Sequence, residues 1–383
     1  MKIDPYKHKE GYLAWKERNK NGIPRISREN SDLAMQYLEN MEAGINIALG
    51  SVKGSRSYSR LLSLKNRMVF FSKKFKELYN LDNVTQVSED QLIGFFSNIK
   101  KGIIKRGDGG EFKSAETYAK VFKAFWHWWM KINRKKGIEV LDITVDLDTK
   151  QEKPDWVYLT EEQIKKLCDN ALFEYKVLIM FLFDTGIRAP TEMLNIKVSD
   201  FFNDFKELNI REETSKTFGR RIKLMLCTKL IKDYVKTKGL KPENYLFNIS
   251  PCAINQYLKR LARRVLGDGI SEAGQKFSEL TMYDFRHNSC CYWLPRYKSE
   301  SALKYRFGWK KSEKIHYYSE LLGMTDTISE EDLLIDVTKI EIETRLEKAE
   351  KENKILHERI DSLEQYMNKF MAVASKMQIE ITA

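Results

Sequence analysis

The 383-residue sequence has no run of about 20 uncharged apolar residues, which excludes a transmembrane helix. No hydrophobic segment follows residues 1–5, so we expect no secretory signal. The five cysteines form no CxxC pair, which argues against zinc ribbons and disulfide scaffolds and for a reducing cytoplasm. We interpret them as small core residues. An internal repeat and a carboxylate-rich metal motif are also absent from the sequence, and we expect no metal or other cofactor.

The charge is basic and unevenly distributed. Lys and Arg number 66 against 54 Asp and Glu, for a net charge of +12. Residues 330–383 contain eight basic and thirteen acidic residues, so this tail carries −5 and the preceding body +17. Clustered Lys and Arg favour a polyanionic partner for the body. Nucleic acid and an anionic membrane surface both fit this charge, and simple solubility is the alternative explanation.

The first third of the chain predicts an arm and a helical domain. Residues 1–30 are basic and without strong periodicity, so we interpret them as an N-terminal arm. Over residues 31–135 apolar residues recur at helical spacing, including a helix that Ser114 is placed to cap. The aromatic run 125–129 fits the core of this small all-helical domain better than a base-stacking platform.

The middle of the chain predicts a linker followed by a mixed α+β domain. Residues 136–157 are polar and are interpreted as an interdomain linker, and residues 158–325 as the second domain. A capping box at residues 160–163 opens a helix, and the apolar run 177–183 fits a central one. Alternation at 208–210 and 222–224 predicts a short hairpin. Further helices are expected at 228–238 and 251–266.

The tail predicts a coiled coil over residues 335–383. Its apolar residues alternate spacings of four and three from Ile342 to Ala374, which is a heptad seam. Asn353 occupies a core position of the seam, a placement that often fixes register and favours a dimer. An amphipathic helix packed on its own domain would give the same local pattern. The predicted fold is therefore mainly α, with a small β-hairpin or sheet and a C-terminal coiled coil.

Four separated fragments carry the chemistry. They are Thr185-Gly186-Ile187-Arg188, then Lys216 at the hairpin, then Tyr283-Asp284-Phe285-Arg286, and finally Gly308-Trp309 nine residues before Tyr318. Each is weak alone, since a lone Arg is usually a surface charge and a Tyr is usually packing. In this order and spacing, over roughly residues 160–320, the sequence resembles the tyrosine recombinase (phage integrase) family.

The resemblance implies a helical core-binding domain and a catalytic domain that close on double-stranded DNA. It implies cleavage and rejoining of strands through a 3′-phosphotyrosyl intermediate, by a tetramer on two DNA sites. Integration or excision of a mobile element and resolution of chromosome or plasmid dimers all use this chemistry. We therefore expect a cytoplasmic, DNA-associated protein that needs no cofactor and contacts no membrane.

The same residues suit this reaction on chemical grounds. Tyr318 is the predicted nucleophile. Arg188 and Arg286 present planar guanidiniums that match the non-bridging phosphate oxygens. Lys216 is the predicted acid for the 5′-oxygen, and the indole N–H of Trp309 can donate to the phosphate.

Three departures from the family pattern stand out. Tyr283 occupies a position that is usually histidine, where a phenol donates a hydrogen bond but is a poor base at neutral pH. Glu192 lies four residues after the first arginine, where three is usual, which indicates an insertion near Pro190. Tyr317 adjoins Tyr318 and is the alternative nucleophile.

Two further groups of cations are candidates for DNA contact. Arg220 and Arg221 follow Lys216 closely and are predicted to hold the hairpin against the backbone. The predicted helix at 251–266 carries a stripe of cationic side chains, formed by Lys259, Arg260, Arg263 and Arg264. This stripe is either a DNA contact or an ordinary solvated face. Two other functions remain open: a type IB topoisomerase that relaxes supercoils, and a DNA-binding protein without catalysis on an integrase scaffold.

Overall fold

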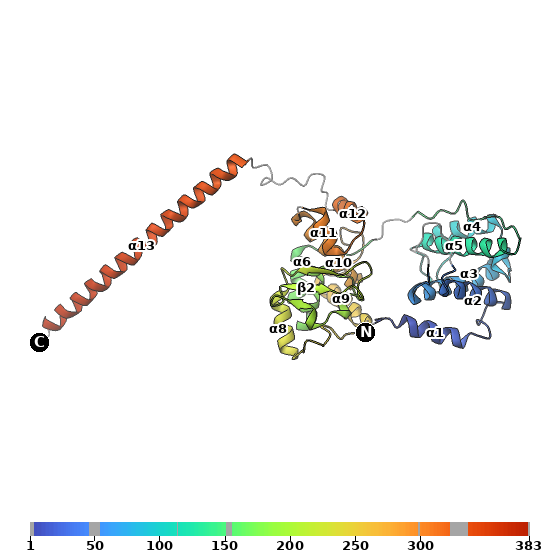
Figure 1. Ribbon diagram of the computed structural model, residues 1–383, viewed down its shortest axis with the longest axis horizontal. Coiled ribbons are helices and arrows are strands. Elements are labelled where there is room, and N and C mark those ends of the chain that lie inside the picture. Colours follow the sequence, from blue (N-terminus) through green and yellow to red (C-terminus); the bar gives the residue numbers. More distant parts are fainter. Residues whose placement is uncertain are drawn as a thin grey trace. The chain divides into compact units, whose positions relative to one another are not determined.

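The structure of the protein is a computed structural model that describes residues 4–45, 54–112, 114–150, 155–297, 299–321 and 336–381 (Figure 1). The chain divides into two compact units, Met1–Glu313 and Lys314–Ala383. Across the described ranges, no helix is both long and apolar enough to cross a membrane.

The N-terminal part of the first unit is helical. Its helices are α1 (His8–Arg18), α2 (Arg28–Glu42), α3 (Tyr58–Tyr79), α4 (Glu89–Lys100) and α5 (Ala115–Arg134). Hydroxyl caps start several of them: Ser27, Ser57 and Ser88 each accept a hydrogen bond from a backbone N–H of the following turn. Ser114 lies at the N-cap position of α5, as the sequence predicts, but its side chain makes no capping hydrogen bond.

Part of the predicted N-terminal arm belongs to the core of this helical region. Helix α1 contacts α3, and Tyr12 is fully buried. Ile23 is buried in the same hydrophobic cluster. Residues 8–23 therefore pack as part of the domain and not as a separate arm. The few apolar side chains that anchor them are too sparse to give a periodic signal.

The aromatic run is core, as expected. Phe125, Trp126 and Trp128 are all buried on α5. Residues beyond α5, within the predicted linker, also pack on this region: the Trp126 indole Nε1–H donates to the Leu141 carbonyl oxygen (2.9 Å), and Leu147 is buried in the same cluster.

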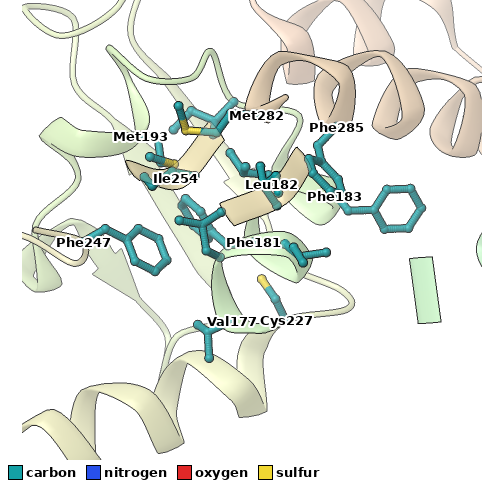
Figure 2. Packing of buried hydrophobic residues seen from close by; sticks show 14 of the residues in the cluster. Val177, Phe181, Leu182, Phe183, Met193, Cys227, Phe247, Ile254, Met282 and Phe285 are labelled. Atoms are coloured by element: carbon teal, nitrogen blue, oxygen red, sulfur yellow. The ribbon is translucent and has the colours of Figure 1, made fainter. Parts of the chain in front are cut away.

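The second core belongs to residues 157–285 and is built around α7 (Phe173–Thr185). Helix α7 contacts α6 (Glu161–Asp169), α8 (Thr228–Lys238) and α10 (Met282–Trp293). Its side chains Val177, Phe181 and Leu182 are buried among residues of neighbouring elements (Figure 2). The apolar run 177–183 is therefore central, as predicted. The remaining helices of this region are α9 (Pro251–Leu266) and α11 (Glu300–Phe307). Helix α12 (Glu313–Leu321) belongs to the second unit from Lys314 onward.

A three-stranded antiparallel sheet accompanies these helices. Its strands are β1 (Phe201–Phe202), β2 (Glu207–Ile210) and β3 (Arg220–Lys223), in the order β1-β2-β3. Leu208 pairs with Ile222, and both are buried. The predicted hairpin is therefore confirmed as β2–β3, while β1 was missed because two residues are too short to show alternation. The fold is mainly helical with one small sheet, as expected.

In the second unit, α13 (Asp336–Ile381) is one helix of 46 residues. At 1.5 Å per residue it is about 69 Å long. Five residues of the predicted seam have side chains that are more than half exposed: Leu346, Leu356, Ile360, Leu363 and Met367. The continuous helix agrees with the heptad pattern, and its pairing with a second helix stays a prediction.

Candidate active site

The turn after α7 places the first arginine. Gly186 ends α7 in the left-handed conformation, with φ +57°. A Cβ atom at this position would lie 2.2 Å from Cε1 of Phe307, so a larger residue would clash. The tight turn lets Arg188 face the start of the segment that follows α11, where its Nη2 donates to the Gly308 carbonyl oxygen (2.8 Å).

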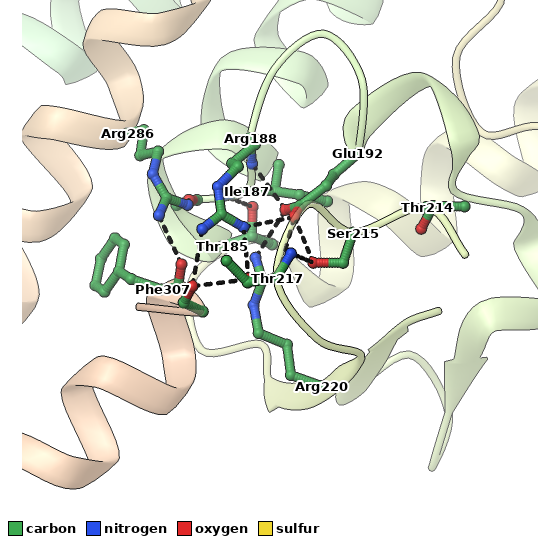
Figure 3. A network of polar contacts seen from close by, with 12 residues as sticks. Thr185, Ile187, Arg188, Glu192, Thr214, Ser215, Thr217, Arg220, Arg286 and Phe307 are labelled. Carbon is green, nitrogen blue, oxygen red and sulfur yellow. Dashed lines mark hydrogen bonds and ion pairs between the residues drawn. The ribbon is translucent and has the colours of Figure 1, made fainter. Parts of the chain in front are cut away.

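Glu192 is the buried centre of the site, with 1% of its surface exposed. Its carboxylate accepts from Arg188 Nη1 (2.8 Å) and from Arg220 Nη2 (2.8 Å) (Figure 3). It also accepts from the Arg188 backbone N–H (3.0 Å) and from the Ser215 hydroxyl (3.0 Å). Burial raises the pKa of Glu192, but the hydrogen bond and charge of Arg220 and the charge of Arg188 outweigh it and lower the pKa to about 2. This carboxylate is therefore ionised and fixes both arginines.

Three arginines hold three consecutive carbonyl oxygens at the C-terminal end of α11. Arg220 Nε donates to the Arg306 carbonyl (2.9 Å), Arg286 Nη2 to that of Phe307 (2.6 Å) and Arg188 Nη2 to that of Gly308 (2.8 Å). These carbonyls have no partner within their helix, and cations are favourable at this end of the helix dipole. The helix end therefore orients the guanidiniums of elements that are distant in sequence.

Arg286 lies on α10, one turn after its N-terminus. That end is closed by a capping box in which Thr281 N–H donates to Asp284 Oδ2 (2.7 Å). Arg286 is 3% exposed, and its Nη1 donates to the Gly186 carbonyl oxygen (2.5 Å). Burial and the neighbouring charge of Arg188 lower the pKa of Arg286 below its ordinary range. A guanidinium nevertheless remains a cation at neutral pH.

Trp309 lies beside Arg286. Its ring stacks on Phe307 at a centroid distance of 4.9 Å, and the Arg286 Cζ is 5.8 Å from the Trp309 ring centroid. The structure therefore brings the predicted Trp309 and both predicted arginines to one place.

Lys216 lies in the loop that joins β2 to β3 and is exposed. Its two neighbours are tied to the site. The Ser215 hydroxyl donates to Glu192, and the Thr217 hydroxyl donates to the Gly308 carbonyl oxygen (2.9 Å) and accepts from Arg188 Nη1 (3.3 Å). Within the part of the chain that the structure describes, the Lys216 ammonium makes no hydrogen bond or ion pair. The backbone of the loop therefore holds Lys216 near the arginines, and the charge of its ammonium group is available to a ligand.

Sequence reasoning did not identify Ser215 and Thr217 as part of the site. Both link the lysine loop to the arginines through hydroxyl groups, and their position beside Lys216 was the only available signal. The burial of Glu192 was also not predicted, because a single acidic residue after an arginine gives no indication that its side chain is buried.

Tyr283 differs from Tyr317 and Tyr318 in its exposure and in its neighbouring side chains. Tyr283 is 51% exposed on the first turn of α10, and its ring packs edge-on against His287 at 5.1 Å between centroids. Tyr317 and Tyr318 are both carried by α12, with their ring centroids 5.2 Å apart. Tyr318 is the more buried of the two, at 4% exposed.

Arg220 does not occupy the DNA-facing position expected from the sequence. It is 2% exposed, and its guanidinium is engaged by Glu192 and by the Arg306 carbonyl oxygen. Because Arg220 faces the interior from β3, its guanidinium is not accessible to a phosphate of DNA. Arg221 points to the other face, is about half exposed, and pairs with Glu207.

The predicted cationic stripe lies on α9 and is largely exposed. Two of its members are paired with carboxylates, Lys259 with Glu279 and Arg263 with Asp268. The guanidiniums of the other two donate to backbone carbonyl oxygens, Arg260 to Gln256 (3.3 Å) and Arg264 to Asn170 (2.8 Å). The stripe is therefore accessible but partly neutralised.

The groups gathered here suit a phosphodiester. Two fixed guanidiniums and an indole lie at one place, and the loop that carries the Lys216 ammonium is tied to it through Ser215 and Thr217. Each of these groups is a donor that matches phosphate oxygens. Among the residues that the structure describes, no group of three His, Cys, Asp or Glu side chains is arranged to hold a metal ion.

Comparison with solved structures gives the fold. The chain is similar to the Tn1549 transposon integrase in complex with a circular intermediate DNA, with 13% identity, 82% of this chain and 98% of that chain covered, and a TM-score of 0.54. It is similar to a lambda integrase dimer bound to a core site, with 12% identity, coverage of 78% and 98%, and a TM-score of 0.57. The XerH site-specific recombinase bound to its difH substrate matches with 14% identity, coverage of 68% and 77%, and a TM-score of 0.50.

Curated protein sequences contain no match to this chain. The family model for the phage integrase family matches residues 157–323, the region that holds Arg188, Lys216, Arg286, Trp309 and Tyr318. Residues 157–323 of the chain therefore form a region of the phage integrase family, the tyrosine recombinases.

Proposed function

We propose that this protein is a site-specific tyrosine recombinase that cleaves and rejoins DNA strands. The observation that carries the proposal is the convergence of Arg188, Arg286 and Trp309 around one place, with the Lys216 loop tied to it through Thr217. These residues come from four separate segments, and general packing would not require them to meet. The family's solved members described above are bound to DNA, which agrees with a DNA substrate.

In this mechanism the Tyr318 hydroxyl oxygen attacks the scissile phosphorus and loses its proton to solvent. Arg188 and Arg286 stabilise the charge that develops on the non-bridging oxygens. The bond from phosphorus to the 5′-oxygen breaks, and Lys216 gives that oxygen a proton. The product is a 3′-phosphotyrosyl bond, which a second 5′-hydroxyl attacks to rejoin the strand. Tyr283 and Trp309 donate hydrogen bonds to the phosphate.

The substrate is double-stranded DNA, and the biological outcome is integration or excision of a mobile element or the resolution of dimers. Arg221 and the exposed members of the α9 stripe contact phosphates in this proposal, since exposed cations strengthen binding to the backbone. Arg220 is assigned to the interior, where it fixes Glu192.

We also propose that α13 pairs with α13 of a second copy as a two-stranded coiled coil. Its exposed apolar seam, with Leu356 and Leu363 more than half exposed, extends over more than four heptads. The polar Asn353 within the seam favours a low oligomer number and a fixed register. The net charge of −5 over residues 330–383 disfavours DNA as the partner of this helix. The coiled coil would bring together the protomers that act as a tetramer on two DNA sites.

A nicked suicide substrate, built on the DNA that flanks the gene, tests the proposed activity. A recombinase should form a covalent protein–DNA adduct that survives denaturation. A non-catalytic DNA-binding protein on an integrase scaffold would bind the same DNA without an adduct. A type IB topoisomerase would instead relax supercoiled plasmid that lacks the site, and we expect no such relaxation.

A further inference from the structure

Asp184 and Arg306 form a buried ion pair that the reaction described above does not use. Arg306 Nη2 donates to Asp184 Oδ1 (2.8 Å), and the two residues are 2% and 0% exposed. Asp184 lies in the last turn of α7 and Arg306 in the last turn of α11. A buried ion pair is weak evidence for a role in stability, because well-packed apolar residues often stabilise a protein as much. The pair therefore calls for an explanation in terms of geometry.

Asp184 is fixed by several elements at once. Its Oδ2 accepts from three consecutive backbone N–H groups at the start of α8, those of Met225 (2.9 Å), Leu226 (2.7 Å) and Cys227 (3.1 Å). Its backbone carbonyl oxygen accepts from the indole Nε1–H of Trp293 on α10 (2.8 Å). A carboxylate that is held from α7, α8 and α10 gives Arg306 an anchor with a defined position.

The guanidinium of Arg306 carries this anchor over to α11. Besides Asp184, its Nη1 donates to the Lys223 carbonyl oxygen of β3 (3.0 Å) and to the Tyr297 hydroxyl (3.3 Å). Its Cζ lies 4.2 Å from the Trp293 ring centroid. The backbone of the same residue belongs to the active site, because the Arg306 carbonyl is the first of the three carbonyls that accept hydrogen bonds from arginines. Arg306 therefore joins a fixed anchor to the helix end that orients the guanidiniums.

We propose that Arg306, anchored on Asp184, is a positioning residue for strand cleavage. It sets the place of the carbonyl oxygens at the end of α11, and through them the direction of the guanidiniums of Arg188 and Arg286. The guanidinium of Arg306 is buried, so it touches no substrate and acts only through these arginines. This inference rests on the proposed function for the reaction that the arginines serve. A displacement of about 1 Å at a catalytic group can cost about 10²-fold in rate.

Single-turnover adduct formation by the full chain on a saturating suicide substrate tests this inference. Arg306→Met should slow the reaction by about 10²-fold. Its DNA affinity should stay within about threefold of the parent, because exposed cations make the backbone contacts. Asp184→Asn breaks the same ion pair from the other side and should slow the reaction to the same extent, and the double variant should be no slower than either single one. Arg211→Met, which removes an ion pair with the buried Asp200 in the same domain, is the matched control and should keep the parent rate.

A methylphosphonate at the scissile position separates positioning from a general structural defect. One non-bridging oxygen of this substrate is replaced by a methyl group, so the linkage carries no charge and depends less on well-placed guanidiniums. The rate loss of Arg306→Met should therefore shrink to less than about tenfold on this substrate. A partly unfolded protein would instead react more slowly with both substrates by the same factor. Asp184→Asn keeps the test decisive if Arg306→Met does not fold.

Two results would overturn the inference while leaving the proposed function intact: a parent rate in Arg306→Met, or equal rate losses on the charged and the neutral substrate. Equilibrium binding in the Tyr318→Phe background gives a readout that does not need cleavage. That protein should bind the charged duplex more tightly than the methylphosphonate duplex, and adding Arg306→Met should remove the preference. A parent that forms no adduct but shows this Arg306-dependent preference would overturn only the catalytic proposal.

Discussion

Replacing Glu192 by Gln tests whether this buried carboxylate organises the active site. The substitution keeps the shape of the side chain but removes the charge that pairs with Arg188 and Arg220. Removing one partner of a buried ion pair typically costs about 3–5 kcal/mol, because the other charge stays buried without compensation. The depressed pKa gives a similar figure, since a shift from 4.5 to about 2 corresponds to about 3 kcal/mol.

The assay is denaturant unfolding of the parent, of Glu192→Gln and of a control, Glu207→Gln. Glu207 pairs with the half-exposed Arg221, so its loss should cost less than about 1 kcal/mol. The effect of Glu192 should also depend on pH. A carboxyl group with a lowered folded-state pKa stabilises the protein above its ordinary pKa of 4.5, and this contribution is lost as the pH falls toward about 2. The variant should lack that part of the acid sensitivity.

A double-substitution cycle with Arg220→Met completes the test. If the carboxylate and Arg220 act as a pair, the double variant should be more stable than the sum of the two single effects predicts, by at least about 1 kcal/mol. A cost for Glu192→Gln below about 1 kcal/mol, or strictly additive effects, would refute the view that Glu192 holds the site together.

The remaining predictions concern catalysis and assembly. Arg188→Ala and Arg286→Ala should each slow strand cleavage by about 10²–10³, with a smaller loss of DNA binding, and equal losses in gel-shift and cleavage assays would mean that they only hold DNA. Lys216→Ala should be rescued by a substrate with a 5′-thio leaving group, which departs without a proton, and a substrate-independent defect in single-turnover cleavage would remove its role as acid. Deletion of residues 335–383 should leave cleavage of one suicide substrate largely intact and reduce two-site recombination, with mass measurements showing loss of self-association. Full recombination by the truncated chain would contradict the coiled-coil proposal.

Local signals in the sequence predicted much of the helical framework. The capping box at Thr160 and Gln163 is formed, and Pro251 begins α9. The apolar run 177–183 is central because no surface helix could expose so many large side chains. These features depend on residues close together in the chain.

Features that depend on contacts between residues distant in the chain could not be predicted from the sequence. Arg220 and Arg221 are adjacent and identical in type, yet one is buried against Glu192 and the other is half exposed, because β3 alternates its faces. The register of that strand is set by its pairing with β2 and not by local composition. Likewise, the three carbonyl groups at the C-terminal end of α11 that accept hydrogen bonds from the arginines are backbone groups, which no side-chain motif reveals.

The most direct test of the central claim is to identify the residue that becomes attached to DNA. Adduct trapped on a suicide substrate should be digested with protease and nuclease, and the nucleotide-bearing peptide sequenced by mass spectrometry. We expect the nucleotide on Tyr318, and no adduct from Tyr318→Phe while its DNA binding stays within a few-fold of the parent. A nucleotide on Tyr317 would shift the nucleophile by one residue. A folded, DNA-binding protein that yields no phosphotyrosyl peptide would contradict the proposal that this chain is a tyrosine recombinase in function.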